Sequence, residues 1–138
     1  MDKCAVFIKN WQMQCCGNPF SVGDSVEWLA EKCDEPWTYH KDVETVDYYY
    51  EHHSAGWEKL FKISGRVIKI TACYSFIVPD PTDPTGRCGI ITAGGVTQPV
   101  TIGDGWDEDI GEQEFHAYVV CLEEARIAPA KKSEVTFN

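Results

Sequence analysis

Two doublets in the sequence combine side chains that bind metals or act as nucleophiles. Cys15 stands beside Cys16, and His52 stands beside His53. Thiolates and imidazoles are preferred ligands of Zn²⁺, and a thiolate with an imidazole base within reach is a nucleophile. The doublets therefore predict a zinc site or a cysteine-dependent active site, if the fold brings the thiols and the imidazoles into one neighbourhood.

The spacing of the doublets weakens this interpretation. Neighbouring residues of an extended chain point to opposite faces, so each doublet supplies one ligand readily and two only awkwardly. The sequence has no C-x-x-C and lacks the paired hooks of zinc fingers. We therefore predict no cofactor. The alternative is a metal- or cysteine-dependent enzyme that uses zinc or a thiolate at Cys15, Cys16, His52 and His53.

The other cysteines favour core positions in a reducing compartment. The chain has seven cysteines, an odd number, so complete internal disulfide pairing is impossible. Cys4 and Cys121 lie within apolar runs, and we expect both in the core. Five apolar residues separate Lys3 from Lys9, too few for the apolar segment of a signal peptide. The expected location is the cytoplasm.

Aromatic side chains are the second group of candidates. The chain has five tryptophans and six tyrosines, residue types that often dominate protein interfaces. Trp106 follows Gly105, and a tryptophan among turn residues packs as an anchor or lines a pocket. The candidate binding residues are Trp11, Gln12, Trp28, Tyr74 and Trp106. Three of them, Trp28, Tyr74 and Trp106, are expected to line the mouth of a barrel if the ligand is a small molecule.

The balance of charge restricts the class of partner. The 22 acidic and 12 basic residues leave a formal net charge of −10, which argues against binding to nucleic acids or anionic membrane surfaces. No run approaches the roughly 18 apolar residues of a membrane span. A basic protein or a small ligand remains as the partner. Six carboxylates gather around Trp106, without the spacing of an EF-hand: Asp104, Asp107, Glu108, Asp109, Glu112 and Glu114.

Alternating apolar and polar residues predict a mainly β chain. The clearest run begins near Lys62 and is long enough to bend, and Gly65 within it marks a bulge or a close backbone approach. Three prolines in residues 79–86 end that strand in a loop. The predicted strands cover residues 4–8, 25–31, 62–78, 88–92, 96–102, 115–122 and 125–127.

One segment fits two elements. Val43, Val46 and Tyr50 have helical spacing behind a potential cap at Asp42, whereas consecutive tyrosines favour a strand. We predict a helix between Asp42 and His53, with a strand over residues 46–50 as the alternative. The whole pattern predicts a small antiparallel β-barrel, SH3-like or OB-like, or a sandwich, with one short helix. It forms one domain over residues 1–130, followed by a frayed tail at residues 131–138.

The sequence resembles an uncharacterised bacterial family of small domains of unknown function. The similarity is strongest in the opening motif W-Q-M-Q-C-C-G at residues 11–17 and extends over most of residues 4–122. The resemblance implies no activity, cofactor or partner. It does imply that three parts of the chain belong to one shared architecture: the Cys15-Cys16 turn, Glu51-His52-His53 and Trp106. The other matching pieces are Pro19-Phe20, Val22-Gly23-Asp24, Val26-Glu27-Trp28, Gly65-Arg66-Val67, Ile70, Asp104-Gly105, Phe115 and Tyr118-Val119-Val120.

These features favour a non-catalytic module over an enzyme. The Walker loop, G-x-G-x-x-G, G-x-S-x-G and H-E-x-x-H motifs are missing from the sequence. A small acidic β-domain with aromatic loops is suited to covering a basic site on another protein. We predict a binding or interaction module of the inhibitor or immunity type.

Overall fold

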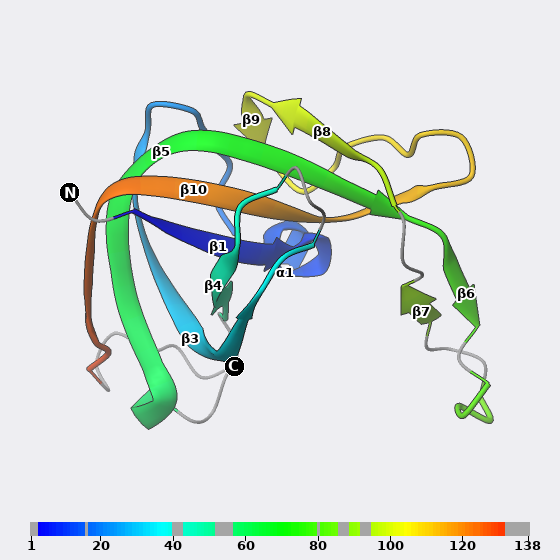
Figure 1. Cartoon of the computed structure of the whole chain (residues 1–138), viewed down its shortest axis with the longest axis horizontal. Coiled ribbons are helices and arrows are strands. Elements are labelled where there is room, and N and C mark those ends of the chain that lie inside the picture. Colours follow the sequence, from blue (N-terminus) through cyan, green and yellow to red (C-terminus); the bar gives the residue numbers. More distant parts are fainter. Residues whose placement is uncertain are drawn as a thin grey trace.

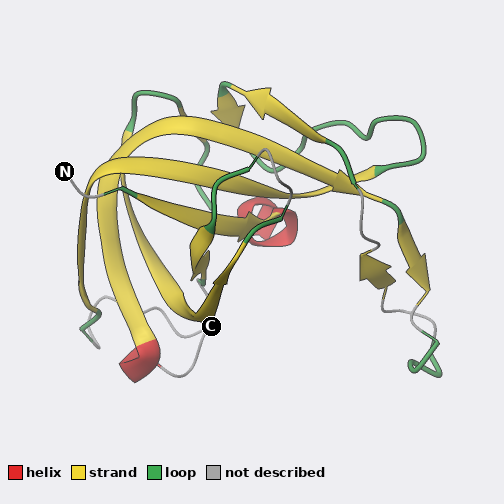
Figure 2. Cartoon of the chain, viewed as in Figure 1, coloured by secondary structure: helices red, strands yellow, loops and turns green. Residues whose placement is uncertain are grey.

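A computed structural model describes residues 3–15, 17–39, 43–51, 57–79, 81–85, 89–91 and 95–131. The fold is mainly β with one short helix, as predicted (Figures 1 and 2). In chain order the elements are β1 (Cys4–Lys9), α1 (Asn10–Cys15), β2 (Phe20–Ser21), β3 (Ser25–Trp37), β4 (Val46–Tyr50), the 3₁₀ turn η1 (Trp57–Lys59), β5 (Leu60–Ser75), β6 (Ile77–Pro79), β7 (Gly89–Ile91), β8 (Thr97–Val100), β9 (Ile102–Gly103) and β10 (Glu114–Pro129).

Five strands pair in a closed ring. The order in the main sheet is β10-β1-β4-β3-β5-β8, and β10 also pairs with β5. Each of β1, β3, β4, β5 and β10 therefore has a described partner on both sides. In Figure 1 the long β5 and β10 curve side by side over β1, and the β6–β7 hairpin projects away from the ring. The turn at residues 81–85 lies where the prolines predicted a loop.

The bend of β5 and β10 is located at Gly65. A Cβ atom on Gly65 would lie 3.0 Å from the Glu123 carbonyl oxygen and 3.2 Å from the Leu122 Cβ. The pairing register shifts on β10 at the same place, between Glu123 and Arg126, and Glu124 has a φ of 52°. This confirms the expected close backbone approach at Gly65. It also joins the separately predicted strand at residues 125–127 to β10.

The sequence prediction of a helix between Asp42 and His53 is wrong, and the alternative of a strand over residues 46–50 is confirmed. Residues 46–50 form strand β4, not a helix, because their burial alternates: Val46, Tyr48 and Tyr50 are buried while Asp47 and Tyr49 are half-exposed. A helix would have turned this apolar set around its axis, whereas a strand keeps it on one face. The short helix lies instead at α1, six residues that are too few to show a clear helical period.

The framework is not wholly antiparallel. β1 and β4 run parallel, with Val6 opposite Tyr48 and Phe7 opposite Tyr49, while the other strand pairs are antiparallel. β3 lies between β1 and β4 in the chain, and β4 reverses the direction of β3. β4 therefore runs in the same direction as β1. The expectation of an antiparallel sheet is therefore wrong at this one pair.

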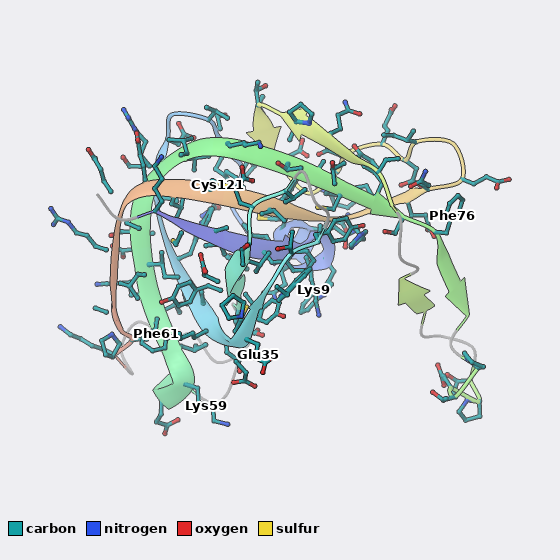
Figure 3. All side chains as sticks on the ribbon, viewed as in Figure 1. Lys9, Glu35, Lys59, Phe61, Phe76 and Cys121 are labelled. Atoms are coloured by element: carbon teal, nitrogen blue, oxygen red, sulfur yellow. The ribbon has the colours of Figure 1, made fainter. Side chains whose placement is uncertain are left out.

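The ring has apolar layers on both of its faces. Alternate residues of β1 divide between the two, so that Val6 and Ile8 join the inner core while Ala5 and Phe7 join an outer cluster with Cys33 and Val43. Figure 3 shows side chains filling the space between β3, β4 and the curved β5. Strands buried on both faces read as continuous apolar runs, which is why residues 4–8 and 115–122 lack a polar face.

Leu122 tests the inner core. Its side chain is 0% exposed, so Leu122→Ala leaves a cavity and should lower the free energy of unfolding by ~2–5 kcal/mol. Ile127 lies on the same strand but is 41% exposed, and Ile127→Ala should cost less than about 1 kcal/mol. Urea denaturation measures both. Equal losses in the two variants would contradict the assignment of Leu122 to the core.

Candidate functional site

The predicted thiol–imidazole site lies outside the described part of the structure. Cys16, His52 and His53 are not among the described residues, and Cys15 is described only as the last residue of α1. In the described ranges, no three His, Cys, Asp or Glu side chains come together as metal ligands. The zinc and cysteine-enzyme alternatives remain predictions.

The described cysteines are core residues. Cys4 and Cys121 are buried, as predicted, together with Cys33 and Cys73. Burial raises the pKa of Cys4 to about 11 and the pKa values of Cys73 and Cys121 to about 12. These four groups are therefore neutral thiols near pH 7, and a neutral thiol is a poor nucleophile.

A hydroxyl–imidazole cluster joins the end of the β3 region to β5 and β10. The Tyr39 hydroxyl lies 2.8 Å from His116 Nε2, donates to the Tyr74 carbonyl oxygen at 3.1 Å and contacts Ser75 Oγ. Ser75 is 1% exposed, and a Cβ atom on Gly95 would lie 2.3 Å from its Oγ. Such packing leaves no space for a substrate beside Ser75. The cluster instead fixes Tyr39 over the outer face of the sheet.

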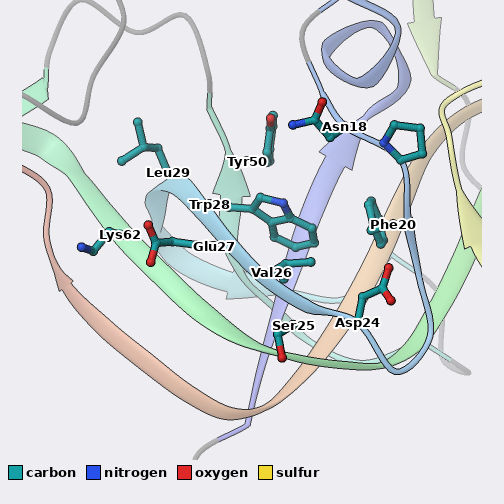
Figure 4. A pocket seen from close by; sticks show the side chains of 11 residues that line it. Asn18, Phe20, Asp24, Ser25, Val26, Glu27, Trp28, Leu29, Tyr50 and Lys62 are labelled. Carbon is teal, nitrogen blue, oxygen red and sulfur yellow. The ribbon is translucent and has the colours of Figure 1, made fainter.

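The candidate site is a cleft beside the first half of β3, with a volume of about 440 Å³ (Figure 4). One wall is the segment between α1 and β2, which ends at the buried Phe20. The other wall is β3, and Tyr50 at the end of β4 closes the top. The lining residues are Asn18, Pro19, Phe20, Asp24, Ser25, Val26, Glu27, Trp28, Leu29, Tyr50 and Lys62.

Three aromatic rings form the inner surface of the cleft. The Trp28 ring packs edge-on against Phe20 at 5.0 Å and against Tyr50 at 5.9 Å. Phe20 is held in turn by Tyr118 at 6.3 Å and by Gly103, where a Cβ atom would lie 2.6 Å from the ring. Trp28 is half-buried, so part of its ring stays open to the cleft while neighbouring rings fix its position.

Charged residues stand on both sides of Trp28. Asp24 lies near Phe20, while Glu27 points away from Trp28 toward Lys62 (Figure 4). The Asp24 carboxylate also accepts a hydrogen bond from the Ser21 N–H at 2.8 Å, which fixes the turn between β2 and β3. The cleft therefore offers an aromatic surface with a carboxylate on its inner side. A second carboxylate and an ammonium group lie on its outer side.

The structure separates the five predicted binding residues. Trp28 lines the cleft. Gln12 does not line it, but the Gln12 side-chain amide donates to the carbonyl oxygen of the cleft residue Tyr50 at 2.9 Å. Tyr74 is 3% exposed in the inner core, whereas Trp11 on α1 is 48% exposed. Trp106 is 67% exposed and does not line the cleft.

The loop that carries Trp106 is tied to the core on both sides of that residue. Tyr118 accepts a hydrogen bond from the Gly105 N–H at 3.0 Å and donates one to Asp107. Gln14 of α1 donates to the Gly105 carbonyl oxygen at 2.8 Å. Gly105 has a φ of 87°, and a Cβ atom there would lie 2.7 Å from the Met13 Cβ. The exposed indole of Trp106 is therefore carried by a fixed backbone.

Sequence reasoning missed Phe20, Asp24 and Tyr50 as cleft residues. Phe20 and Asp24 belong to the segment just before β3, whereas Tyr50 lies at the end of β4. Only the pairing of β3 with β4 and the packing of Phe20 bring the two segments together at Trp28. The available signal was the turn sequence that ends at Asp24 and leads directly to the alternation around Trp28.

A protein-family model described as "Family of unknown function (DUF6578)" matches residues 2–124. No curated protein and no solved structure matches the chain. In the described residues, no helix is long and apolar enough to cross a membrane.

His116 makes stability depend on pH. Burial lowers its pKa from 6.5 to about 4, so between these values the unfolded chain binds a proton that the folded chain does not. The contribution of neutral His116 to the free energy of unfolding is therefore complete above about pH 6.5, and it is lost as the pH falls toward 4. The corresponding decrease is ~3 kcal/mol.

Urea denaturation from about pH 7 to about pH 4 measures this effect. His116→Gln keeps a hydrogen-bonding group but no longer titrates, so its stability should decrease less steeply with acid than that of the wild type. The carboxylates are the same in both proteins, and their contribution cancels in the difference. Parallel stability curves would show that His116 does not cause the dependence.

Proposed function

The chain belongs to the DUF6578 family of unknown function, and we propose that it is a non-catalytic module that binds a basic protein partner. The observation that carries the proposal is the partly open Trp28 ring with a carboxylate on each side of β3. The bound group is an arginine side chain of the partner. The ring of strands is a small barrel, and the cleft is its mouth.

Arginine suits this surface better than other side chains do. A planar guanidinium stacks on aromatic faces and keeps its N–H donors in the plane, where carboxylates accept them. Trp28 supplies the aromatic face and Asp24 the nearby carboxylate. No described residue accepts a hydrogen bond from the Trp28 indole N–H, so this edge of the ring is also available to a partner.

The charge of the whole chain supports the same class of partner. A net charge of −10 attracts a basic surface from a distance and speeds encounter with it. Trp106 is a second contact for the partner, because an exposed indole on a fixed loop loses little conformational entropy on binding. In this role the module covers a basic site, as an inhibitor or immunity-type protein does.

A small cationic molecule is the second candidate ligand. The cleft volume of about 440 Å³ falls within the range of ~300–1,000 Å³ that is usual for small-molecule sites. The aromatic surface would recognise its cation in the same way.

Binding of N-acetyl-argininamide, followed by NMR, tests the proposal. The indole N–H resonance of Trp28, assigned with Trp28→Phe, should shift as the probe is added. Asp24→Asn, whose side-chain oxygen still accepts from the Ser21 N–H, should weaken binding by about two- to fivefold, as expected for an exposed charge. N-acetyl-glutaminamide serves as the neutral probe.

Glu35→Gln is the matched control. Glu35 is exposed on β3 but does not line the cleft, so this variant changes the net charge equally and should leave the affinity unchanged. Equal binding of the neutral probe, or equal effects of Asp24→Asn and Glu35→Gln, would overturn the arginine site.

A further inference from the structure

Among the described residues, the first half of β3 pairs with β5 alone, and we call its other side, toward β4, the open side. β5 pairs with β3 over Ser25–Glu31, whereas β4 pairs with it only from Ala30 onward. One residue before Ala30, the Leu29 carbonyl oxygen accepts a last hydrogen bond from this side, from the Glu51 N–H at 3.1 Å. Among the described strands, none pairs with the preceding residues of β3 on the β4 side.

Two hydrogen bonds establish which backbone groups face the open side. The Asp24 carbonyl oxygen accepts from the Val67 N–H at 2.9 Å, so even-numbered residues here direct their backbone groups toward β5. Backbone groups alternate sides along a strand, and the Leu29 carbonyl accordingly points the other way, toward Glu51. The N–H and C=O groups of Ser25 and Glu27 therefore point toward the open side.

This open edge runs along the cleft. Ser25, Glu27 and Leu29 all line it, and five residues of extended chain cover about 13 Å. Trp28 contributes its ring to the inner side of the same cleft, while Glu27 lies on the outer side (Figure 4). A single bound segment can thus reach the backbone edge, the ring and both carboxylates.

We propose that the partner binds as an extended peptide segment that adds a strand to β3, antiparallel to it and in line with β4. The inference rests on the proposed function, because the arginine at Trp28 belongs to this segment. Strand addition obtains affinity from main-chain hydrogen bonds and specificity from alternate side chains. Here the main-chain partners are Ser25 and Glu27.

The charges of the edge select a basic segment. Asp24 and Glu27 accompany the open backbone groups, and Lys62 lies at the far end beside Leu29. In an antiparallel pair, directly opposed residues share a face. The peptide residue opposite Glu27 therefore lies on the outer face, and its neighbour, the arginine, turns inward to Trp28.

This geometry predicts which peptide N–H groups matter. In the bound peptide, a residue whose side chain faces inward directs its own N–H away from β3. The arginine N–H therefore makes no hydrogen bond to β3. The N–H groups of the residues on either side of the arginine do bond to β3. Binding should therefore be sensitive to methylation at alternate backbone nitrogens.

The probe is acetyl-Val-Thr-Arg-Thr-Val-amide, titrated into the full chain by calorimetry and NMR. N-methylation of both threonines should weaken binding at least about tenfold, because two hydrogen bonds are lost and the methyl groups collide with β3. N-methylation of the arginine and the second valine carries the same number of methyl groups and should change the affinity by less than about threefold.

The outcomes separate the two proposals. If both methylated peptides bind like the parent, or if the sensitivity is reversed, antiparallel strand addition is wrong, while the arginine site still stands on the argininamide result. If neither argininamide nor the parent peptide perturbs the Trp28 indole, both proposals fail. Weakening by threonine methylation alone supports strand addition.

Discussion

Gly65 lets the backbones of β5 and β10 approach at the point where β10 bulges around Glu124, and the two longest strands bend there together. The bend allows β5 to pair with β3 before it and with β8 beyond it along one edge. β10 carries β1 on its other edge, and β4 completes the ring. The position at which β3 starts is therefore set by the bend, not by the length of β4.

The cleft exists because β3 begins several residues before its pairing with β4 does. Five residues of β3, from Ser25 to Leu29, precede the first residue that pairs with β4. The turn at Asp24 and the buried Phe20 hold the opposite wall of the cleft in place. An unpaired strand edge carries a risk of unwanted association, which natural sheets limit with charged residues. Glu27 at the centre of the edge serves that purpose and also selects a basic partner over an acidic one.

The sequence predicts the strands better than their partners. Alternation located the segments that became β3 and β5, since a buried face imposes a period of two. Short continuous apolar runs located β1 and the first half of β10. It failed at residues 46–50, where three apolar residues fit both periods, and at the parallel β1–β4 pair, because strand direction depends on contacts distant in the chain. Trp28 was recognisable as a candidate from its residue type. Its companions Phe20 and Tyr50 were not, because only the tertiary fold brings them to the same ring.

Hydrogen exchange of the unliganded protein tests the central claim, that β3 presents an open edge, most directly. The amides of Val26 and Trp28 point toward β5 and should exchange slowly, whereas those of Ser25 and Glu27 should exchange much faster. Such alternation within four consecutive residues is the signature of a strand paired on one side. Slow exchange at all four amides would mean that the chain already covers this edge, and the account of partner binding given above would be wrong.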